Sequence, residues 1–330
     1  MPRFKVFVTR RIDQQSLDFI SKHARVDIWE KEDTPPRAEF KRRIADVDGI
    51  LLWGADEIDG ELMDAAPKLK VIANIAMGYN NIDVEAATAR GIRVSNTPDV
   101  VTDSTADLTL GLLIAIARRI YEMANLVKQP GGWKMWGPME MLGVEVSGKT
   151  LGIVGMGRIG AAVARRARGF DMRIIYHNRH RRPDDTELGA EYVKDLPTLL
   201  HRSDFVSINV PLNKETRHLI GAKELAMMKP TAILVNTSRG AVIDQKALYE
   251  ALKNKRIHAA ALDVTEVEPI PHDDPLLKLD NVLIVPHIGT QTMETGARMS
   301  MLAAENLICA LTDKPMPSCV NRQLLEKKVS

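Results

Sequence analysis

Three residues in the second half of the chain, Arg239, Glu268 and His287, each follow a predicted strand and suit acid–base or electrostatic chemistry. Ligands of open α/β sheets bind outside the carboxyl ends of the strands, so we expect the three side chains to face one crevice. A histidine titrates near neutral pH and can donate a proton, and a carboxylate beside it favours the protonated form. An arginine can stabilise negative charge that develops on an oxygen.

Each of these residues alone is more often a salt-bridge partner or a core histidine, but a glycine-rich motif precedes them. The motif has the form G-x-G-x-x-G and comprises Gly155, Met156, Gly157, Arg158, Ile159 and Gly160. It follows a predicted strand and opens a predicted helix over 158–169, the context that a dinucleotide-binding turn requires. Together, the motif and the three residues predict hydride transfer from a nicotinamide cofactor to a keto carbon, with His287 as the general acid.

The end of the next predicted strand lacks the acidic residue that usually binds the adenosine ribose. Asn178 stands at that position, and Arg179 follows it at the start of a basic segment over 179–182. Guanidinium groups pair with phosphates in a bidentate manner, so this segment could hold a 2′-phosphate. We therefore predict NADPH as the preferred cofactor and NADH as a weaker alternative. A solvated basic loop is the competing interpretation.

Short β-branched runs alternate with helical stretches along most of the chain, a pattern typical of parallel α/β units. The predicted strands are residues 5–9, 26–29, 49–53, 70–75, 92–95, 150–154, 172–176, 205–210, 232–236, 258–262 and 282–285. A long helix is predicted over 103–125 with Asp103 or Ser104 as its N-cap, and a final amphipathic helix over 292–311. Because the alternation restarts near residue 148, we expect one domain to be inserted within another.

The composition excludes several other classes of protein. The 330 residues suggest two domains at roughly 150 residues each. The 45 basic and 43 acidic residues are spread along the chain, unlike the concentrated basic face of a nucleic-acid binder. Cys309 and Cys319 match no metal-ligand spacing, and the longest uncharged apolar run, 108–117, is too short to span a bilayer. A strand-like run at the N-terminus leaves no room for a signal peptide, so we expect a cytoplasmic protein without metal, nucleic acid or membrane partners.

Five segments in the expected order resemble the D-isomer-specific 2-hydroxyacid dehydrogenase family. They are residues 96–103, 155–160, 236–240, 263–269 and 286–289. The resemblance implies an α/β fold of two Rossmann-like domains, with an NAD(P)-binding domain (100–287) inserted in a flavodoxin-like, discontinuous substrate domain (1–99 and 288–330). It also implies a homodimer and gives Arg239, Glu268 and His287 the family's catalytic positions.

The same resemblance implies further binding residues. Asp263 is similar to the family residue that contacts the nicotinamide carboxamide, and Met77 with Gly78 resembles the loop whose backbone amides bind the substrate carboxylate. Trp136 lies in a Gly- and Trp-rich arm that is expected to cross the dimer interface toward the neighbouring active site. The remaining cofactor contacts that the resemblance implies are Thr105, Val210, Pro211, Thr237, Ser238, His287 and Gly289.

Finer similarity points to the glyoxylate/hydroxypyruvate reductase branch, whose members reduce small 2-keto acids to D-2-hydroxy acids. The features that carry it are the 97–100 segment, the tryptophan arm, Asn178 and the 314–317 segment. A reductase of 2-ketogluconate or another 2-keto acid from the same family is the main alternative. A nucleotide-sensing, corepressor-like binding protein is an alternative from another class, because such proteins can keep all three catalytic residues.

Overall fold

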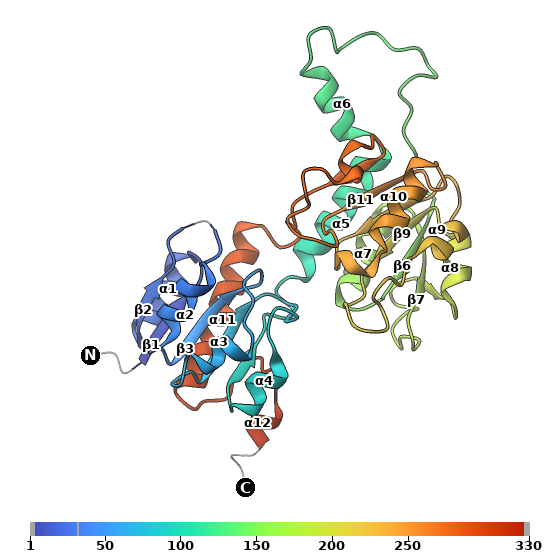
Figure 1. Ribbon diagram of the computed structural model, residues 1–330. Coiled ribbons are helices and arrows are strands. Elements are labelled where there is room, and N and C mark those ends of the chain that lie inside the picture. The colour runs from blue at the N-terminus through green and yellow to red at the C-terminus, as the bar shows by residue number, and fades with distance from the viewer. Residues whose placement is uncertain (1–3, 32, 327–330) are drawn as a thin grey trace. The chain divides into compact units, whose positions relative to one another are not determined.

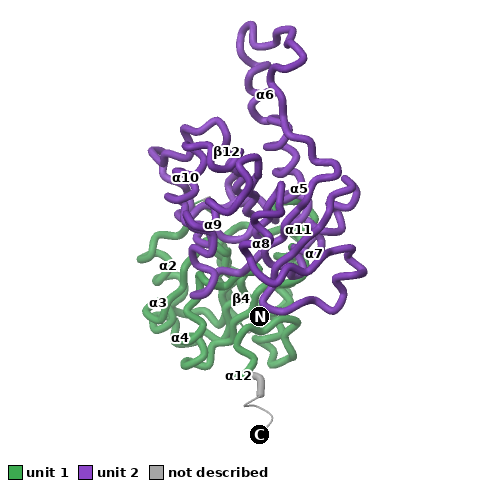
Figure 2. Tube along the Cα trace, turned by 90° about the vertical axis from the view of Figure 1, so that its right-hand side faces the viewer, with its two compact units in different colours: residues 1–101, 291–330 green, residues 102–290 purple. Residues whose placement is uncertain are grey.

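The computed structural model describes residues 4–31 and 33–326, which form two compact units (Figures 1 and 2). Unit 1 comprises Met1–Val101 and Gln291–Ser330, and unit 2 comprises Thr102–Thr290. The chain thus leaves unit 1, completes unit 2 and returns to unit 1. The family resemblance predicts boundaries two or three residues away, at 99/100 and 287/288.

Unit 1 is built on a parallel five-stranded sheet in the order β2-β1-β3-β4-β5, the flavodoxin-like order. Its strands are β1 (Phe4–Val8), β2 (Ala24–Ile28), β3 (Gly49–Trp53), β4 (Val71–Ile75) and β5 (Arg93–Ser95). Its helices are α1 (Gln14–Ser21), α2 (Arg37–Ile44), α3 (Gly60–Asp64), α4 (Val84–Ala89), α11 (Met293–Leu311) and α12 (Gln323–Glu326).

Both faces of this sheet are covered because successive residues of a strand point to opposite sides. Val6 and Val8 belong to a buried cluster with α1 and α11, whereas Phe7 belongs to another with α2, α3 and α4. Helix α11 (red in Figure 1) contributes Met299 and Leu307 to the first cluster. The last long helix of the chain therefore completes the core of the first unit.

Unit 2 is built on a parallel seven-stranded sheet in the order β12-β11-β10-β9-β6-β7-β8, a Rossmann arrangement with one added strand. Its strands are β6 (Thr150–Val154), β7 (Arg173–His177), β8 (Ala190–Tyr192), β9 (Phe205–Ile208), β10 (Ile233–Asn236), β11 (Ala259–Leu262) and β12 (Val282–Ile284). Its helices are α5 (Thr102–Ala117), α6 (Ile120–Val127), α7 (Arg158–Ala167), α8 (Leu196–Arg202), α9 (Ala222–Met227) and α10 (Gln245–Lys253). Helices α5 and α7 cover one face, and α8, α9 and α10 cover the other. The two parallel sheets confirm the predicted fold class.

The helix predicted over 103–125 is wrong in both its start and its continuity. It begins at Thr102, so Asp103 and Ser104 lie within its first turn instead of capping it. Arg119 then takes a left-handed conformation (φ 52°) and separates α5 from α6. The returning chain caps the break, since the N–H of Val144 donates to the carbonyl of Ala117 at 2.7 Å. Sequence pattern does not reveal that long-range partner.

Helix α6 and the following segment up to about residue 145 extend away from the body of unit 2, and both views show this arm (Figures 1 and 2). Its apolar side chains are largely exposed, including Tyr121, Trp133, Met135 and Met139.

The short strand β8 was not predicted, because a three-residue Ala-Glu-Tyr run has no distinctive pattern. Within the described ranges, no helix combines the length and apolar character that crossing a bilayer needs.

Candidate active site

The carboxyl ends of the adjacent strands β10, β11 and β12 carry Arg239, Glu268 and His287 on the loops that follow them. The Nδ1 of His287 donates a hydrogen bond to Oε2 of Glu268 at 2.7 Å. Both side chains are partly exposed, 47% for His287 and 39% for Glu268. The structure therefore joins a histidine and a carboxylate that lie nineteen residues apart in the sequence, and within residues 4–31 and 33–326 no contact is described for the histidine's Nε2.

The backbone around His287 is held by Asp263. His287 has a left-handed conformation (φ 53°), and its N–H donates to the carbonyl of Asp263 at 2.9 Å. The Asp263 carboxylate accepts the N–H groups of Ile288 at 2.6 Å and Gly289 at 2.9 Å. Burial raises the pKa of Asp263, while these N–H donors and the charge of His287 oppose the rise. Asp263 thus fixes the turn that presents the imidazole.

The electrostatics of Glu268 favour its ionised form. Burial alone would raise its pKa, but the hydrogen bond and charge of His287 outweigh that effect, with smaller contributions from the Thr265 N–H and the charge of Arg239. The pKa of Glu268 therefore lies below its usual value. The Thr265 N–H donates to the other carboxylate oxygen, Oε1, at 3.1 Å. An ionised Glu268 accepts the Nδ1–H of His287 and can hold the ring in one orientation.

Arg239 follows a turn organised by the side chain of Asn236. Asn236 Oδ1 accepts the N–H and hydroxyl of Ser238 at 3.0 and 2.8 Å, and its Nδ2 donates to the Arg239 carbonyl at 3.0 Å. Burial lowers the pKa of Arg239, and the charge of Glu268 opposes that lowering. The guanidinium is thus a half-buried cation near the Glu268–His287 pair, suited to binding an anionic oxygen.

The glycine motif lies where the strand order of the sheet reverses, between β6 and β9. Gly155 has φ +95°, and a Cβ there would lie 2.7 Å from Val210 Cγ1. A Cβ at Gly160 would lie 2.4 Å from the Gly155 carbonyl, so glycine is required for the close turn. A Cβ at Gly157, the N-cap of α7, would meet no protein atom within 4 Å among the described residues. These residues fit a dinucleotide, since an open helix N-terminus at the switch point is a ready pyrophosphate site.

Comparisons with known proteins show the family to which this chain belongs. Residues 110–289 match the model of the D-isomer specific 2-hydroxyacid dehydrogenase, NAD binding domain. A glyoxylate reductase of Korarchaeum cryptofilum is 53% identical over 98% of this chain and 97% of its own length. The chain belongs to the D-isomer-specific 2-hydroxyacid dehydrogenase family.

Two solved structures extend the likeness. A protein from Thermus thermophilus is 44% identical, with a TM-score of 0.90 over 96% of this chain and 99% of that one. An NADPH-dependent glyoxylate/hydroxypyruvate reductase from Sinorhizobium meliloti, in complex with NADP and malonate, is 32% identical with a TM-score of 0.84 over 97% of each chain. The protein is a D-2-hydroxyacid dehydrogenase with a nicotinamide cofactor.

In this dehydrogenase, several residues expected to contact the cofactor gather between the catalytic loops and α5. The hydroxyls of Thr109 and Thr237 lie 2.8 Å apart, and Thr109 also donates to the Thr105 carbonyl at 2.7 Å. A Cβ at Gly289 would lie 3.6 Å from Thr105 and 2.9 Å from Asp263. Val210 and Pro211 follow β9 beside Gly155. Thr109 and Asn236 were not predicted as site residues, because only the fold shows that they brace the others.

The region after β7 is more tightly bonded than the sequence suggests. Asn178 Oδ1 accepts the N–H of Met156 at 2.6 Å, so the amide faces the glycine turn. Arg179 is 79% exposed and pairs with Glu215 at 2.9 Å. Arg181 and Arg182 pair with Asp185 and Asp184. Each arginine of the basic segment therefore has a nearby carboxylate, which any phosphate must compete with.

Arg182 makes a contact that sequence reasoning missed. Its guanidinium donates to the Met156 carbonyl at 2.9 Å, and its N–H donates to the Tyr176 hydroxyl at 2.8 Å. The Met156 peptide is thus held on both sides, by Asn178 and by Arg182. Spacing could not reveal this, because the contact depends on how the 179–185 segment folds back toward the glycine turn.

The expected substrate-binding residues outside the catalytic loops belong to two other segments. Met77 and Gly78 follow β4 in unit 1, where their carbonyls accept the side-chain amides of Asn96 at 2.8 Å and Asn74 at 2.9 Å. Trp136 lies in the arm of unit 2 and is 43% exposed. None of the contacts described for residues 4–31 and 33–326 joins Trp136 to the catalytic side chains.

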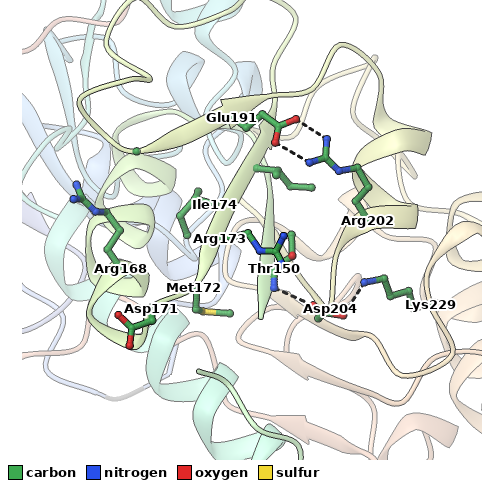
Figure 3. Close-up of a pocket in the computed structure, with 12 residues that line it drawn as sticks. Thr150, Arg168, Asp171, Met172, Arg173, Ile174, Glu191, Arg202, Asp204 and Lys229 are labelled. Atoms are coloured by element: carbon green, nitrogen blue, oxygen red, sulfur yellow. Dashed lines mark hydrogen bonds and ion pairs between the residues drawn. The ribbon is translucent and has the colours of Figure 1, made fainter. Parts of the chain in front are cut away.

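A pocket of about 810 Å³ opens at the opposite, amino-terminal ends of the unit 2 strands (Figure 3). Thr150 at the start of β6 and Arg173 at the start of β7 line it, together with charged side chains that bond to one another. Arg202 pairs with Glu191 at 2.6 Å, and Lys229 pairs with Asp204 at 2.7 Å. Its size does not make it the active site, since it lies at the wrong edge of the sheet for the catalytic loops.

Proposed function

We propose that this dehydrogenase reduces small 2-keto acids, glyoxylate and hydroxypyruvate, to the corresponding 2-hydroxy acids, of D configuration where the product is chiral, with His287 as the general acid. The observation that carries the proposal is the 2.7 Å hydrogen bond from His287 Nδ1 to Glu268, because it leaves Nε2 as the proton donor. Relatives named glyoxylate reductase, about half identical over nearly the whole chain, support the substrate class.

The glycine turn and the N-terminus of α7 would hold the nicotinamide cofactor, which would supply the hydride. His287 Nε2 then gives its proton to the keto oxygen as negative charge develops there, and the neutral ring keeps its Nδ1 proton, which stays hydrogen-bonded to Glu268. Arg239 stabilises the oxygen and the substrate carboxylate, which a half-buried guanidinium does more effectively than one in water. Proton uptake from solvent returns His287 to its starting form.

The substrate carboxylate would also be bound by the amide N–H groups of Met77 and Gly78. Asn96 and Asn74 hold the carbonyls of this loop, and no described contact uses the two N–H groups. Backbone N–H groups held in this way form a small anion site. Asn96→Ala should raise KM for glyoxylate several-fold, leaving the Kd of the cofactor unchanged.

For the cofactor we propose a preference for NADPH, with NADH as the weaker alternative. Asn178 places no negative charge near the ribose, and Arg179 and Arg182 are close in sequence and carry guanidinium groups. Their partners Glu215 and Asp184 reduce the gain, since a phosphate must displace or share them. The relative from Sinorhizobium meliloti is described as NADPH-dependent, which is consistent with this proposal.

We also propose that the dehydrogenase is a homodimer joined through the arm. Tyr121, Trp133 and Met135 are 59%, 76% and 95% exposed, and clustered apolar surface of this kind usually marks an interface. Light scattering of the purified protein tests the proposal, and a monomer at micromolar concentration would refute it.

Steady-state oxidation of NADPH and NADH across a panel of 2-keto acids tests the function as a whole. Glyoxylate and hydroxypyruvate should give the highest kcat/KM, and chiral analysis of the hydroxypyruvate product should give the D isomer. Preferred turnover of 2-ketogluconate would move the chain to the alternative substrate class. Absence of turnover with every 2-keto acid, despite cofactor binding, would favour a binding protein.

A further inference from the structure

A second histidine–carboxylate pair lies beside the first and has no part in the proton transfer. The Nε2 of His218 donates a hydrogen bond to Oε1 of Glu266 at 2.6 Å, and their side chains are 41% and 29% exposed. Glu266 belongs to the same loop as Glu268, two residues earlier in the chain. One residue, Val267, separates Glu266 from Glu268 along the chain.

His218 is tied by its backbone to the loop that carries Arg239. It has a left-handed conformation (φ 53°), and its N–H donates to the carbonyl of Ala241 at 2.8 Å. Two residues further on, the N–H of Ile220 donates to the carbonyl of Val242 at 3.1 Å. Thus one residue bonds by its main chain to the segment after Arg239 and by its side chain to the segment before Glu268.

The same two loops also meet through their backbones. A Cβ built on Gly240 would lie 1.9 Å from the Thr265 carbonyl oxygen and 2.5 Å from the Glu266 nitrogen, so only glycine fits. The Glu266 N–H donates to Gln245 Oε1 at 2.9 Å, and Gln245 in turn donates to Asp274 at 2.7 Å. These contacts set how closely the loops approach. Two side chains from the β9 side are described against this loop, and both meet Glu266: His218 through its hydrogen bond and Arg217 at longer range.

We propose that His218 is a positioning residue, which holds the 265–268 loop so that Glu268 meets Nδ1 of His287. The inference rests on the proposed roles of Glu268 and His287. Small displacements matter here, because a shift of about 1 Å in a catalytic group can lower turnover by about 10²-fold. A partly exposed ion pair contributes little to the free energy of folding. Stability alone therefore gives little reason for the His218–Glu266 pair.

The charged groups that face Glu266 are few. Arg217, next to His218, has a guanidinium nitrogen 3.9 Å from Glu266 Oε1. Glu268 is on the same loop, and Asp274 acts through Gln245. Arg217 is therefore the matched control, since it is a neighbouring cation at longer range without the backbone tie to Ala241.

The test compares His218→Ala, His218→Gln and Arg217→Ala in the full-length enzyme, with kcat, KM, cofactor Kd, Tm and the pH dependence of kcat/KM as readouts. His218→Ala should lower kcat for glyoxylate about tenfold and move the pH profile of kcat/KM in the same direction as Glu268→Gln does, since Glu268 then meets Nδ1 of His287 less often. His218→Gln should restore most of both, because its amide N–H can reach Glu266. Neither replacement is β-branched, so the left-handed backbone costs both variants a similar amount. Arg217→Ala should change little.

Glu268→Gln separates the failure of this inference from that of the proposed function. If Glu268→Gln moves the pH profile and His218→Ala does not, the positioning role is wrong and the proposed mechanism stands. If neither moves it, the proposed mechanism itself is wrong. The double variant should be no slower than Glu268→Gln alone, since His218 acts through Glu268. A Tm loss of several degrees with unchanged kcat and pH profile would show that His218 is structural only.

Discussion

The two edges of the unit 2 sheet both carry paired charged side chains, but the pairs differ in whether they leave a hydrogen-bond donor for a ligand. At the amino-terminal edge, charged side chains of the Figure 3 pocket form ion pairs with one another, as in the two bonds of Arg202 to Glu191 at 2.6 and 2.7 Å. At the carboxyl edge, the bond between His287 and Glu268 satisfies one ring nitrogen, and the described part of the chain offers the other no partner. Neither the volume of a pocket nor the number of its charges therefore identifies the catalytic edge of the sheet. What identifies it is the His287–Glu268 pair, in which the second ring nitrogen can still donate a proton.

The difference follows from how a parallel sheet is connected. The loops after the strands enter helices at their N-termini, where free N–H groups attract anions, as at Gly157 and α7. Backbone N–H groups also fix the loops that carry the catalytic residues, since those of Ile288 and Gly289 donate to the Asp263 carboxylate. At the other edge the strands begin, and long charged side chains pair across the surface.

The largest effect should come from removing the unused donor. His287→Ala is expected to lower kcat by about 10²–10⁴-fold, the contribution of a positioned general acid. The Kd of the cofactor should change far less than kcat, because no described contact joins the imidazole to the glycine turn. Stopped-flow turnover and fluorescence titration measure the two. Near wild-type turnover of glyoxylate would contradict the proposed role of this edge.

The second-largest effect is expected on the preference for NADPH over NADH. Hydrogen bonds to charged groups contribute roughly 1.5–3 kcal/mol each, so Asn178→Asp with Arg179→Ile should reverse an NADPH preference of about 10²-fold while keeping kcat at saturation. Glu215→Gln is the control in the opposite direction, since it removes the carboxylate that pairs with Arg179 and should raise the preference for NADPH a few-fold. High salt should weaken both effects. If the wild-type enzyme uses NADH equally well at low salt, the basic segment is only a solvated loop.

A smaller effect is expected in the arm. If Trp136 reaches the active site of a second subunit, Trp136→Ala should raise KM for glyoxylate several-fold with little change in Tm. Trp133→Ala, on the same arm and more exposed, serves as the comparison variant. A large fall in Tm with unchanged KM would instead assign Trp136 to packing.

The smallest effect should come from the amino-terminal edge. Arg202→Ala removes an exposed ion pair, so the free energy of unfolding should change by less than about 1 kcal/mol. Turnover and cofactor affinity should match the wild-type enzyme. A clear loss of activity in this variant would contradict the claim that only the carboxyl edge of the sheet takes part in catalysis.

Local pattern predicted most of the strands and the final helix, because buried β-branched runs and an amphipathic stretch are visible in the sequence; Thr292, where that helix was predicted to begin, is its N-cap. It also indicated that Arg239, Glu268 and His287 follow neighbouring strands. It could not predict the break at Arg119 or the pairing of Arg179 with Glu215, which depend on partners far along the chain. The contact of His218 with Glu266 was missed for the same reason, since forty-eight residues separate them.

The path of α11 has a consequence for how the protein is made. The strands of unit 1 are synthesised first, but the face that buries Val71 and Ala73 needs Met299 and Leu307. Unit 2, whose residues are contiguous, can close while α11 is still untranslated. We therefore expect the nascent chain to fold its inserted unit before its N-terminal one, reversing the usual order of cotranslational folding. A chain that stops before residue 293 would leave unit 1 with an open core.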